Sequence, residues 1–163
     1  MPVVPFDSLP DSSRVWIFGA ADALSPAAAE ALLTAVEAYL EGWKAHGNPL
    51  TVGSQLREER FLAVAVDQKQ EGATGCSIDG LFRILQGLES SLGTSLVGGG
   101  RVYYRDGHGK VACAERGDAP TLASTGAISK DTVVFDTSLT DLGTFRSQFE
   151  RPARDSWVAG LLG

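Results

Sequence analysis

The chain has 163 residues, of which 44% are hydrophobic, enough for one ordinary domain or two very small ones with a real core. A net charge of −6 disfavours a broad surface for nucleic acid or anionic lipid, since both are negatively charged. No apolar run approaches the ~20 residues that span a bilayer, and residues 1–10 contain neither a cationic segment nor a signal-peptide core. We therefore expect a cytoplasmic protein without membrane or nucleic-acid partners, whose two cysteines are reduced.

The first predicted elements are a strand and a helix. β-branched and aromatic residues at 14–18 predict a buried strand. Ser25 and Pro26 are typical of an N-cap and a first helical residue, and the apolar face of the helix that follows ends near Gly47.

Two strands and a second helix follow. Residues 51–58 and 61–66 predict paired strands, the second apolar on both faces as a central strand requires. Ser77 is the expected N-cap of the next helix. The predicted class is α+β. The order βαββα, completed by one more strand, is the ferredoxin-like pattern of two helices on one face of an antiparallel sheet.

Gly98–Gly100 is linker-like and divides an expected α+β domain, residues 1–97, from a smaller hairpin-containing subdomain, residues 98–163, which could still pack as one domain. Asp106–Gly109 predicts a hairpin turn. The hairpin strands are expected at 101–105 and 110–114, followed by a short helix at 121–125, a strand at 133–135 and an amphipathic stretch at 145–157.

A thiol at a helix start is the strongest chemical pattern. Cys76 directly precedes Ser77, where a helix dipole favours the thiolate. Asp67 would lie at the same rim as an orienting carboxylate, and His46 or His108 would serve as base. Equally, Cys76 is a small apolar residue under the helix and its neighbours are ordinary capping residues, the interpretation we favour.

Nucleotide and metal motifs are missing from the sequence. The glycines at 72, 75 and 80 match neither dinucleotide nor Walker A spacing, and a solvated turn explains them better than an anion site. The histidines and cysteines lack the paired spacing of zinc ligands. We expect no cofactor and no metal.

The last third is rich in aromatic residues, among them Tyr103, Tyr104 and Trp157. An exposed aromatic shelf of this kind binds peptides, whereas burial of the same rings would form the core of the small subdomain.

Six segments resemble a family of small bacterial proteins, mainly of the Bacteroidetes type, that often carry the label "ABC transporter ATPase". They are Phe6-Asp-Ser-Leu-Pro10, Arg14-Val-Trp16, Trp43-x-x-His46-Gly-x-Pro-Leu50, Arg60-Phe61, Gly75-Cys-Ser-Ile-Asp79 and Pro152-Ala-Arg-x-Ser-Trp157. The resemblance implies no activity, because the chain has no Walker A motif and no ATPase signature.

A second resemblance concerns the last third. Val102-Tyr-Tyr-Arg-Asp-Gly107 and the segment 122–135 are similar to the GYF-2 type of bacterial interaction module, although the Gly-Pro step that normally follows the hairpin is absent. The resemblance implies a hairpin containing Tyr103 and Tyr104, then a helix and a strand. We therefore predict a non-enzymatic interaction or accessory protein that binds another protein or itself as a homodimer, with a thiol-dependent enzyme as the alternative.

Overall fold

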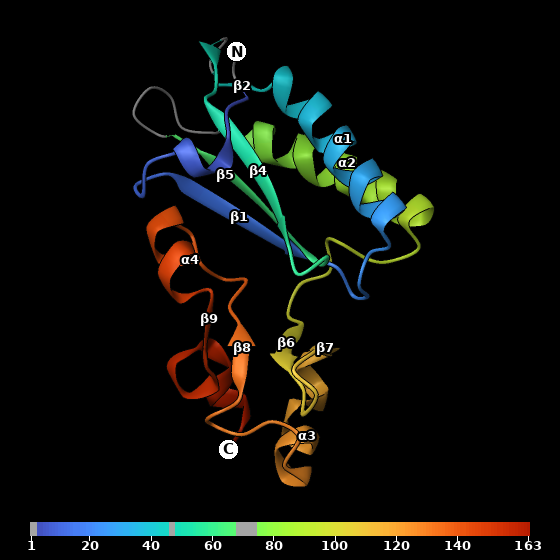
Figure 1. Ribbon diagram of the computed structural model, residues 1–163, viewed down its shortest axis with the longest axis vertical. Helices are drawn as coiled ribbons and strands as arrows, with labels where there is room; N and C mark the ends of the chain where they lie inside the picture. The colour runs from blue at the N-terminus through green and yellow to red at the C-terminus, as the bar shows by residue number, and fades with distance from the viewer. Residues whose placement is uncertain (1–2, 46–47, 68–74) are drawn as a thin grey trace. The chain divides into compact units, whose positions relative to one another are not determined.

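The computed structural model describes residues 3–45, 48–67 and 75–163, with the backbone alone at 44–45, 48–49 and 75–77 (Figure 1). Its helices and antiparallel sheets confirm the α+β class. The chain forms two compact units. Unit 1 comprises Met1–Val97 and Leu139–Phe145, and unit 2 comprises Gly98–Ser138 and Arg146–Gly163.

The helices are α1 (Pro26–Glu41), α2 (Gly75–Leu92), α3 (Ala119–Thr125) and α4 (Leu142–Gln148), with short 3-10 turns η1 (Phe6–Ser8), η2 (Arg116–Asp118), η3 (Ala153–Asp155) and η4 (Trp157–Leu161). The strands are β1 (Arg14–Gly19), β2 (Lys44–Ala45), β3 (Asn48–Pro49), β4 (Val52–Arg57), β5 (Phe61–Val66), β6 (Val102–Arg105), β7 (Val111–Ala114), β8 (Val133–Phe135) and β9 (Glu150–Pro152). No helix of the described ranges is both long and apolar enough to cross a membrane.

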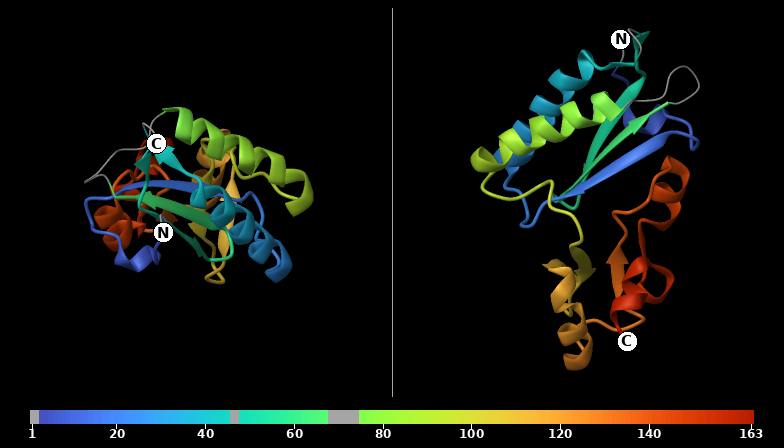
Figure 2. Two further views of the ribbon diagram at one scale, coloured as in Figure 1. Left: turned by 90° about the horizontal axis from the view of Figure 1, so that it is seen from above. Right: turned by 180° about the vertical axis from the view of Figure 1, so that it is seen from behind.

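Unit 1 is built on the sheet β1-β5-β4, in which both outer strands run antiparallel to β5. Helices α1 and α2 lie together on one face of this sheet (Figures 1 and 2). The predicted order βαββα is therefore present, with the short β2–β3 hairpin inserted before β4. The outer strands β1 and β4 are parallel to each other on either side of β5, which is the strand arrangement of the predicted pattern.

A fourth full strand does not complete this sheet within the described residues. Beside β1 the chain forms an isolated antiparallel bridge between Arg14 and Asp141, and the Val15 N–H donates to the Thr140 carbonyl at 2.9 Å. The position of the missing strand is thus occupied by a single bridge, because the chain turns into α4 at Leu142.

The central strand β5 is completely buried at every residue, as its continuous apolar sequence predicts. Leu62, Val64 and Val66 pack on the helix side of the sheet with Leu32 and Leu81. Ser25 caps α1 as expected, its Oγ accepting from the Ala28 N–H at 3.1 Å.

Helix boundaries differ from the sequence-based expectation at two places. Helix α1 ends at Glu41 and not near Gly47, because Trp43 turns into the core, where it is 3% exposed, and its carbonyl accepts from the Leu50 N–H. Helix α2 begins at Gly75, so Ser77 lies inside its first turn and not before it.

Unit 2 contains the sheet β7-β6-β8-β9. The β6–β7 hairpin forms as predicted, and the Asp106 carboxylate accepts from the backbone N–H groups of His108 and Lys110. These two bonds lower the pKa of Asp106. The expected amphipathic stretch at 145–157 is divided among the end of α4, β9 and the 3-10 turns.

Candidate functional site

The predicted thiol site cannot be assembled from the described side chains. Cys76 lies in the first turn of α2, where only the backbone is described, and His46 lies outside the described residues. Asp67 directly follows β5 and is half-buried, with its N–H donating to the Thr51 carbonyl at 2.9 Å. His108 is exposed in the hairpin turn. The thiol-dependent reading therefore stays a prediction.

Cys113 lies half-buried in β7, opposite Tyr103. Within the described ranges no three or more His, Cys, Asp or Glu side chains gather where they could hold a metal ion.

The aromatic residues of unit 2 are mainly interior. Tyr103 and Tyr104, adjacent residues of the central strand β6, are 3% and 9% exposed. Trp157 is half-buried against the core of unit 2, with the Arg116 guanidinium 5.6 Å from its ring centroid. Tyr104 belongs to the core of unit 2 and Trp157 packs against it, whereas Tyr103 is buried on the other face of β6, so the three residues do not form an exposed shelf.

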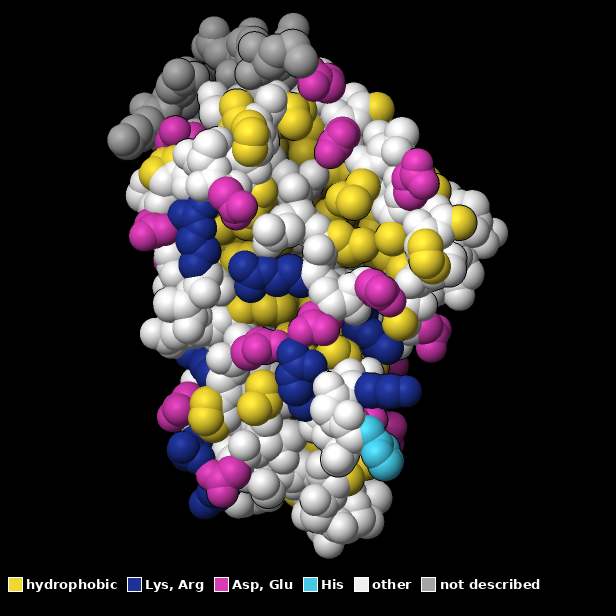
Figure 3. Space-filling model, in the orientation of Figure 1, with side chains coloured by type: hydrophobic (Ala, Val, Ile, Leu, Met, Phe, Trp, Pro, Cys, Tyr) yellow, Lys and Arg dark blue, Asp and Glu magenta, His cyan; other side chains and the backbone are white. Residues whose placement is uncertain are grey.

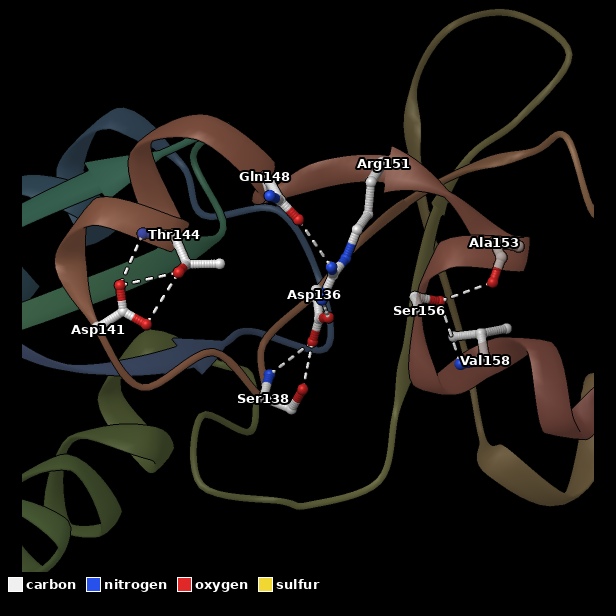
Figure 4. A network of polar contacts seen from close by, with 9 residues as sticks. All are labelled: Asp136, Ser138, Asp141, Thr144, Gln148, Arg151, Ala153, Ser156 and Val158. Carbon is white, nitrogen blue, oxygen red and sulfur yellow. Dashed lines mark hydrogen bonds and ion pairs between the residues drawn. The ribbon is translucent and has the colours of Figure 1, made fainter.

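A buried carboxylate that the sequence analysis did not select lies at the end of β8 (Figure 4). Asp136 accepts from the N–H of Ser138 at 3.0 Å and from its hydroxyl, and forms an ion pair with Arg151. Burial alone would raise the pKa of Asp136, but the hydrogen bonds from Ser138 and Arg151 hold it below its ordinary value. Arg151 also donates to Gln148 at 3.1 Å. The network joins β9 to β8, and its only sequence signal is an aspartate directly after an apolar strand.

On the surface drawn in Figure 3, basic and acidic side chains are interspersed over both units. The large hydrophobic residues Phe82 and Ile84 of α2 are 37% and 36% exposed. Phe82 packs edge-on against Phe18, with ring centroids 5.3 Å apart. Phe82 and Ile84 are two positions apart on the helix, so they lie on opposite sides of the buried face of α2 that contains Leu81 and Leu85.

Each edge of the sheet β1-β5-β4 is bridged at one end by a short segment of the chain. The Arg14–Asp141 bridge covers β1. On the other edge, Val3 forms a parallel bridge with Val52, and the Val4 N–H donates to the Val52 carbonyl at 2.9 Å. Such a segment blocks strand addition at the positions that it bridges.

The β9 edge of unit 2 is protected by its sequence. The Asp136 N–H donates to the Phe149 carbonyl, so by the antiparallel alternation Glu150 and Pro152 are the residues whose backbone points away from β8. Proline has no N–H to offer to a further strand, and Glu150 is charged and ion-paired with Arg105.

The β7 edge is different. The Asp106 N–H donates to the Lys110 carbonyl, and with the β6–β7 register this directs the backbone of Ala112 and Ala114 toward β6. The backbone of Val111 and Cys113 therefore points away from β6, at the outer edge of the sheet. The strand is Val-Ala-Cys-Ala, without a charge or a proline. Among the four edges of the two larger sheets in the described residues, β7 is the one without a bridging segment, a charge or a proline.

Comparison with known proteins gives no further guide. No family model matches the chain. No curated protein matches it significantly, and neither does any solved structure.

Proposed function

We propose that this protein is a non-enzymatic interaction protein that binds an extended segment of another polypeptide chain by strand addition to β7. The observation that supports the proposal is the contrast between β7, which has no charge, proline or bridging segment, and the other three edges, each of which has at least one of these. Strand edges are usually protected because they pair readily with other chains, so an edge left with a small, uncharged sequence is a feature of binding.

In this mode the backbone supplies the affinity and the side chains supply the selectivity. The N–H and C=O groups of Val111 point away from β6, where an added strand would pair with them. The side chains of Val111 and Cys113 share one face of the sheet and would contact alternate residues of the ligand. A small or β-branched residue fits beside Val111 better than a charged one.

A displayed peptide library selected on the folded protein tests the proposal. Selected peptides should shift the amide NMR signals of Val111 to Ala114, and Val111→Lys should weaken their binding at least about tenfold, since charge at an edge opposes strand addition. Val111→Thr keeps the branched shape and is the matched control. Peptides that bind while the β7 signals stay unchanged would overturn the proposal.

A thiol-dependent enzyme is the second candidate, favoured by the place of Cys76 in the first turn of α2. A helix N-terminus stabilises a thiolate and so lowers the pKa of a cysteine. The rate of alkylation of Cys76 across the pH range, in a Cys113→Ser variant, separates the two readings. A plateau that begins well below the ordinary thiol pKa of about 8.5 supports the enzyme, and labelling only after denaturation excludes it.

A further inference from the structure

We infer that unit 1 binds a phosphate group at the loop between β1 and α1, where the buried guanidinium of Arg60 meets the residues that lead into the helix. The site belongs to unit 1 alone and shares no residue with β7. Its ligand is inorganic phosphate or a small phosphate monoester, since both present the same oxyanion.

Arg60 is a buried cation without a counter-charge. The residue is 8% exposed, and its Nη1 donates to the Ala21 carbonyl at 2.9 Å. Its Nε is buried and has no hydrogen-bond acceptor. No carboxylate among the described residues forms an ion pair with this guanidinium. Because a buried charge without a partner is unfavourable, an anion that supplies the missing charge would be bound.

The side chain of Arg60 lies on the helix side of the sheet β1-β5-β4. The Ala20 N–H donates to the Arg60 carbonyl at 2.8 Å, which continues the β1–β5 ladder by one pair. Side chains alternate between the two faces along a strand, so Arg60 shares its face with Leu62, which packs in the core beneath the helices. The bond from Nη1 to Ala21 then directs the guanidinium to the loop between β1 and α1.

The N-terminus of α1 lies beside the turn that carries Arg60, at one end of unit 1 (Figures 1 and 2). The Leu24 N–H donates to the Glu59 carbonyl at 2.8 Å. Helix α1 has 16 residues and no acidic residue in its first turn, so no side-chain charge there matches the positive end of its dipole. The exposed Ala27 lies in this turn, where N–H groups have no partner within the helix. A full cation and a helix N-terminus therefore occur together.

The acidic residues of the same segments do not neutralise Arg60. The carboxylate of Asp22 accepts from the Thr94 hydroxyl at 3.3 Å, and the Asp22 N–H donates to the same hydroxyl oxygen at 3.0 Å. Glu59 is exposed in the turn between β4 and β5. Both carboxylates repel an arriving anion, so removing the charge of Asp22 should strengthen binding.

The donors at this site favour phosphate over a carboxylate. A guanidinium offers several N–H groups in one plane, and a helix N-terminus offers backbone N–H groups of its own. Phosphate has more oxygens and more negative charge than a carboxylate, so it can accept from both sets of donors at once.

An NMR titration of the wild-type protein with inorganic phosphate tests the site. The amide signals of Ala21 and Ala27 and the side-chain N–H signal of Arg60 should shift and reach saturation. Sodium chloride at the same ionic strength should produce no saturable shift. Sodium acetate should bind at least about tenfold more weakly, because it carries less charge. Saturable shifts confined to other residues, or equal affinity for acetate, would overturn the inference.

Glycerol phosphate, a phosphate monoester, distinguishes the two sources of the ligand. Tighter binding of the monoester than of inorganic phosphate identifies a small phosphorylated molecule, and weaker binding identifies the free ion. Binding of neither compound at the signals of Ala21 and Ala27 overturns the site.

Charge variants test the role of Arg60. Arg60→Gln should raise the dissociation constant for inorganic phosphate at least about tenfold, because it removes the cation. Arg83→Gln is the matched control, since it removes the same charge from an exposed position on α2. It should leave the dissociation constant within about twofold of the wild type, because solvent and salt screen an exposed charge. Equal effects of the two variants would contradict the inference.

Asp22→Asn keeps the test decisive even if Arg60→Gln fails to fold. Loss of the repelling carboxylate should lower the dissociation constant for inorganic phosphate about two- to threefold. Phosphate should also raise the midpoint of thermal unfolding of the wild type above its value in chloride, since a ligand of the folded state stabilises it. An unchanged dissociation constant in Asp22→Asn, with no rise of the midpoint in the wild type, would overturn the inference.

Discussion

Arg151 is ion-paired with Asp136, a carboxylate whose side chain is 1% exposed. The pair connects β9 with the residue that follows β8, on the side of unit 2 that lies opposite the β7 edge in the strand order. Removing one charge of a buried ion pair strongly lowers the free energy of unfolding, because the other charge is left without its partner.

Asp136→Asn should therefore lower the free energy of unfolding by about 3 kcal/mol, since it removes the negative charge while keeping the shape of the side chain. Urea denaturation measures the change. Arg154→Gln is the control, because the Arg154–Asp131 pair is 51% and 85% exposed. Its loss should change the free energy of unfolding by no more than about 0.5 kcal/mol. Equal effects of the two variants would contradict the structural role of Asp136.

The same carboxylate predicts a pH dependence. The folded-state pKa of Asp136 lies below its ordinary value of 3.8, so the folded chain holds this proton less tightly than the unfolded chain does. The stabilisation is fully present above the ordinary carboxyl pKa and is lost as the pH falls through the lower folded-state value. Denaturation curves measured from neutral to strongly acidic pH should show a smaller acid loss in Asp136→Asn than in the wild type. Parallel pH profiles would count against the lowered pKa.

The Ser25 hydroxyl caps α1 through the Ala28 N–H. Ser25→Ala should lower the free energy of unfolding by about 1 kcal/mol, because it leaves a helix N–H without its acceptor. Ser25→Asp supplies another acceptor beside the positive end of the helix dipole and should retain the wild-type value in the same urea titration. If Ser25→Ala also retains the wild-type value, the cap contributes nothing to stability.

Replacing either of two glycines of α2 with alanine should have different effects on stability. A Cβ at Gly80 would lie 2.1 Å from the Tyr39 hydroxyl oxygen, whereas a Cβ at Gly87 meets nothing within 4 Å. Gly87→Ala should raise the free energy of unfolding by up to about 1 kcal/mol through helix propensity alone.

Gly80→Ala should lack this gain, because Tyr39 must move away from its contact with Trp43, whose ring centroid is 6.2 Å distant. Tyr39→Phe removes the obstructing oxygen, so Gly80→Ala should be better tolerated in that background than in the wild type. Thermal unfolding of the wild type, the two single variants and the double variant measures the coupling between Gly80 and Tyr39. If the two changes in stability are strictly additive, the close approach of Gly80 to the Tyr39 hydroxyl has no energetic consequence.

Local chemistry accounts for what the sequence predicted well. The β6–β7 turn follows from Asp106 and its neighbouring glycines, which satisfy the turn within a few residues. The continuous apolar run of β5 predicts a strand buried on both faces. The α1 cap follows from Ser25 and Pro26. In each case the groups that interact are close together in the chain.

The candidate site was less predictable. The sequence located the hairpin that contains β7 but directed attention to Tyr103 and Tyr104, whose burial depends on packing against residues far away in the chain. It also singled out Cys76 and not Asp136, since a carboxylate after a strand has no local feature that distinguishes a buried position from a solvated one.

The sequence by itself determined the α+β class, the hairpin and the main helices, because periodicity, caps and turn residues act over short distances. Only the tertiary structure decided which sheet edges are covered. Asp141 reaches Arg14, and Val3 reaches Val52, across separations at which local propensity carries no information. A strand is at the edge of a sheet when it has a neighbouring strand on one side only, and which strands become neighbours depends on how the whole chain packs.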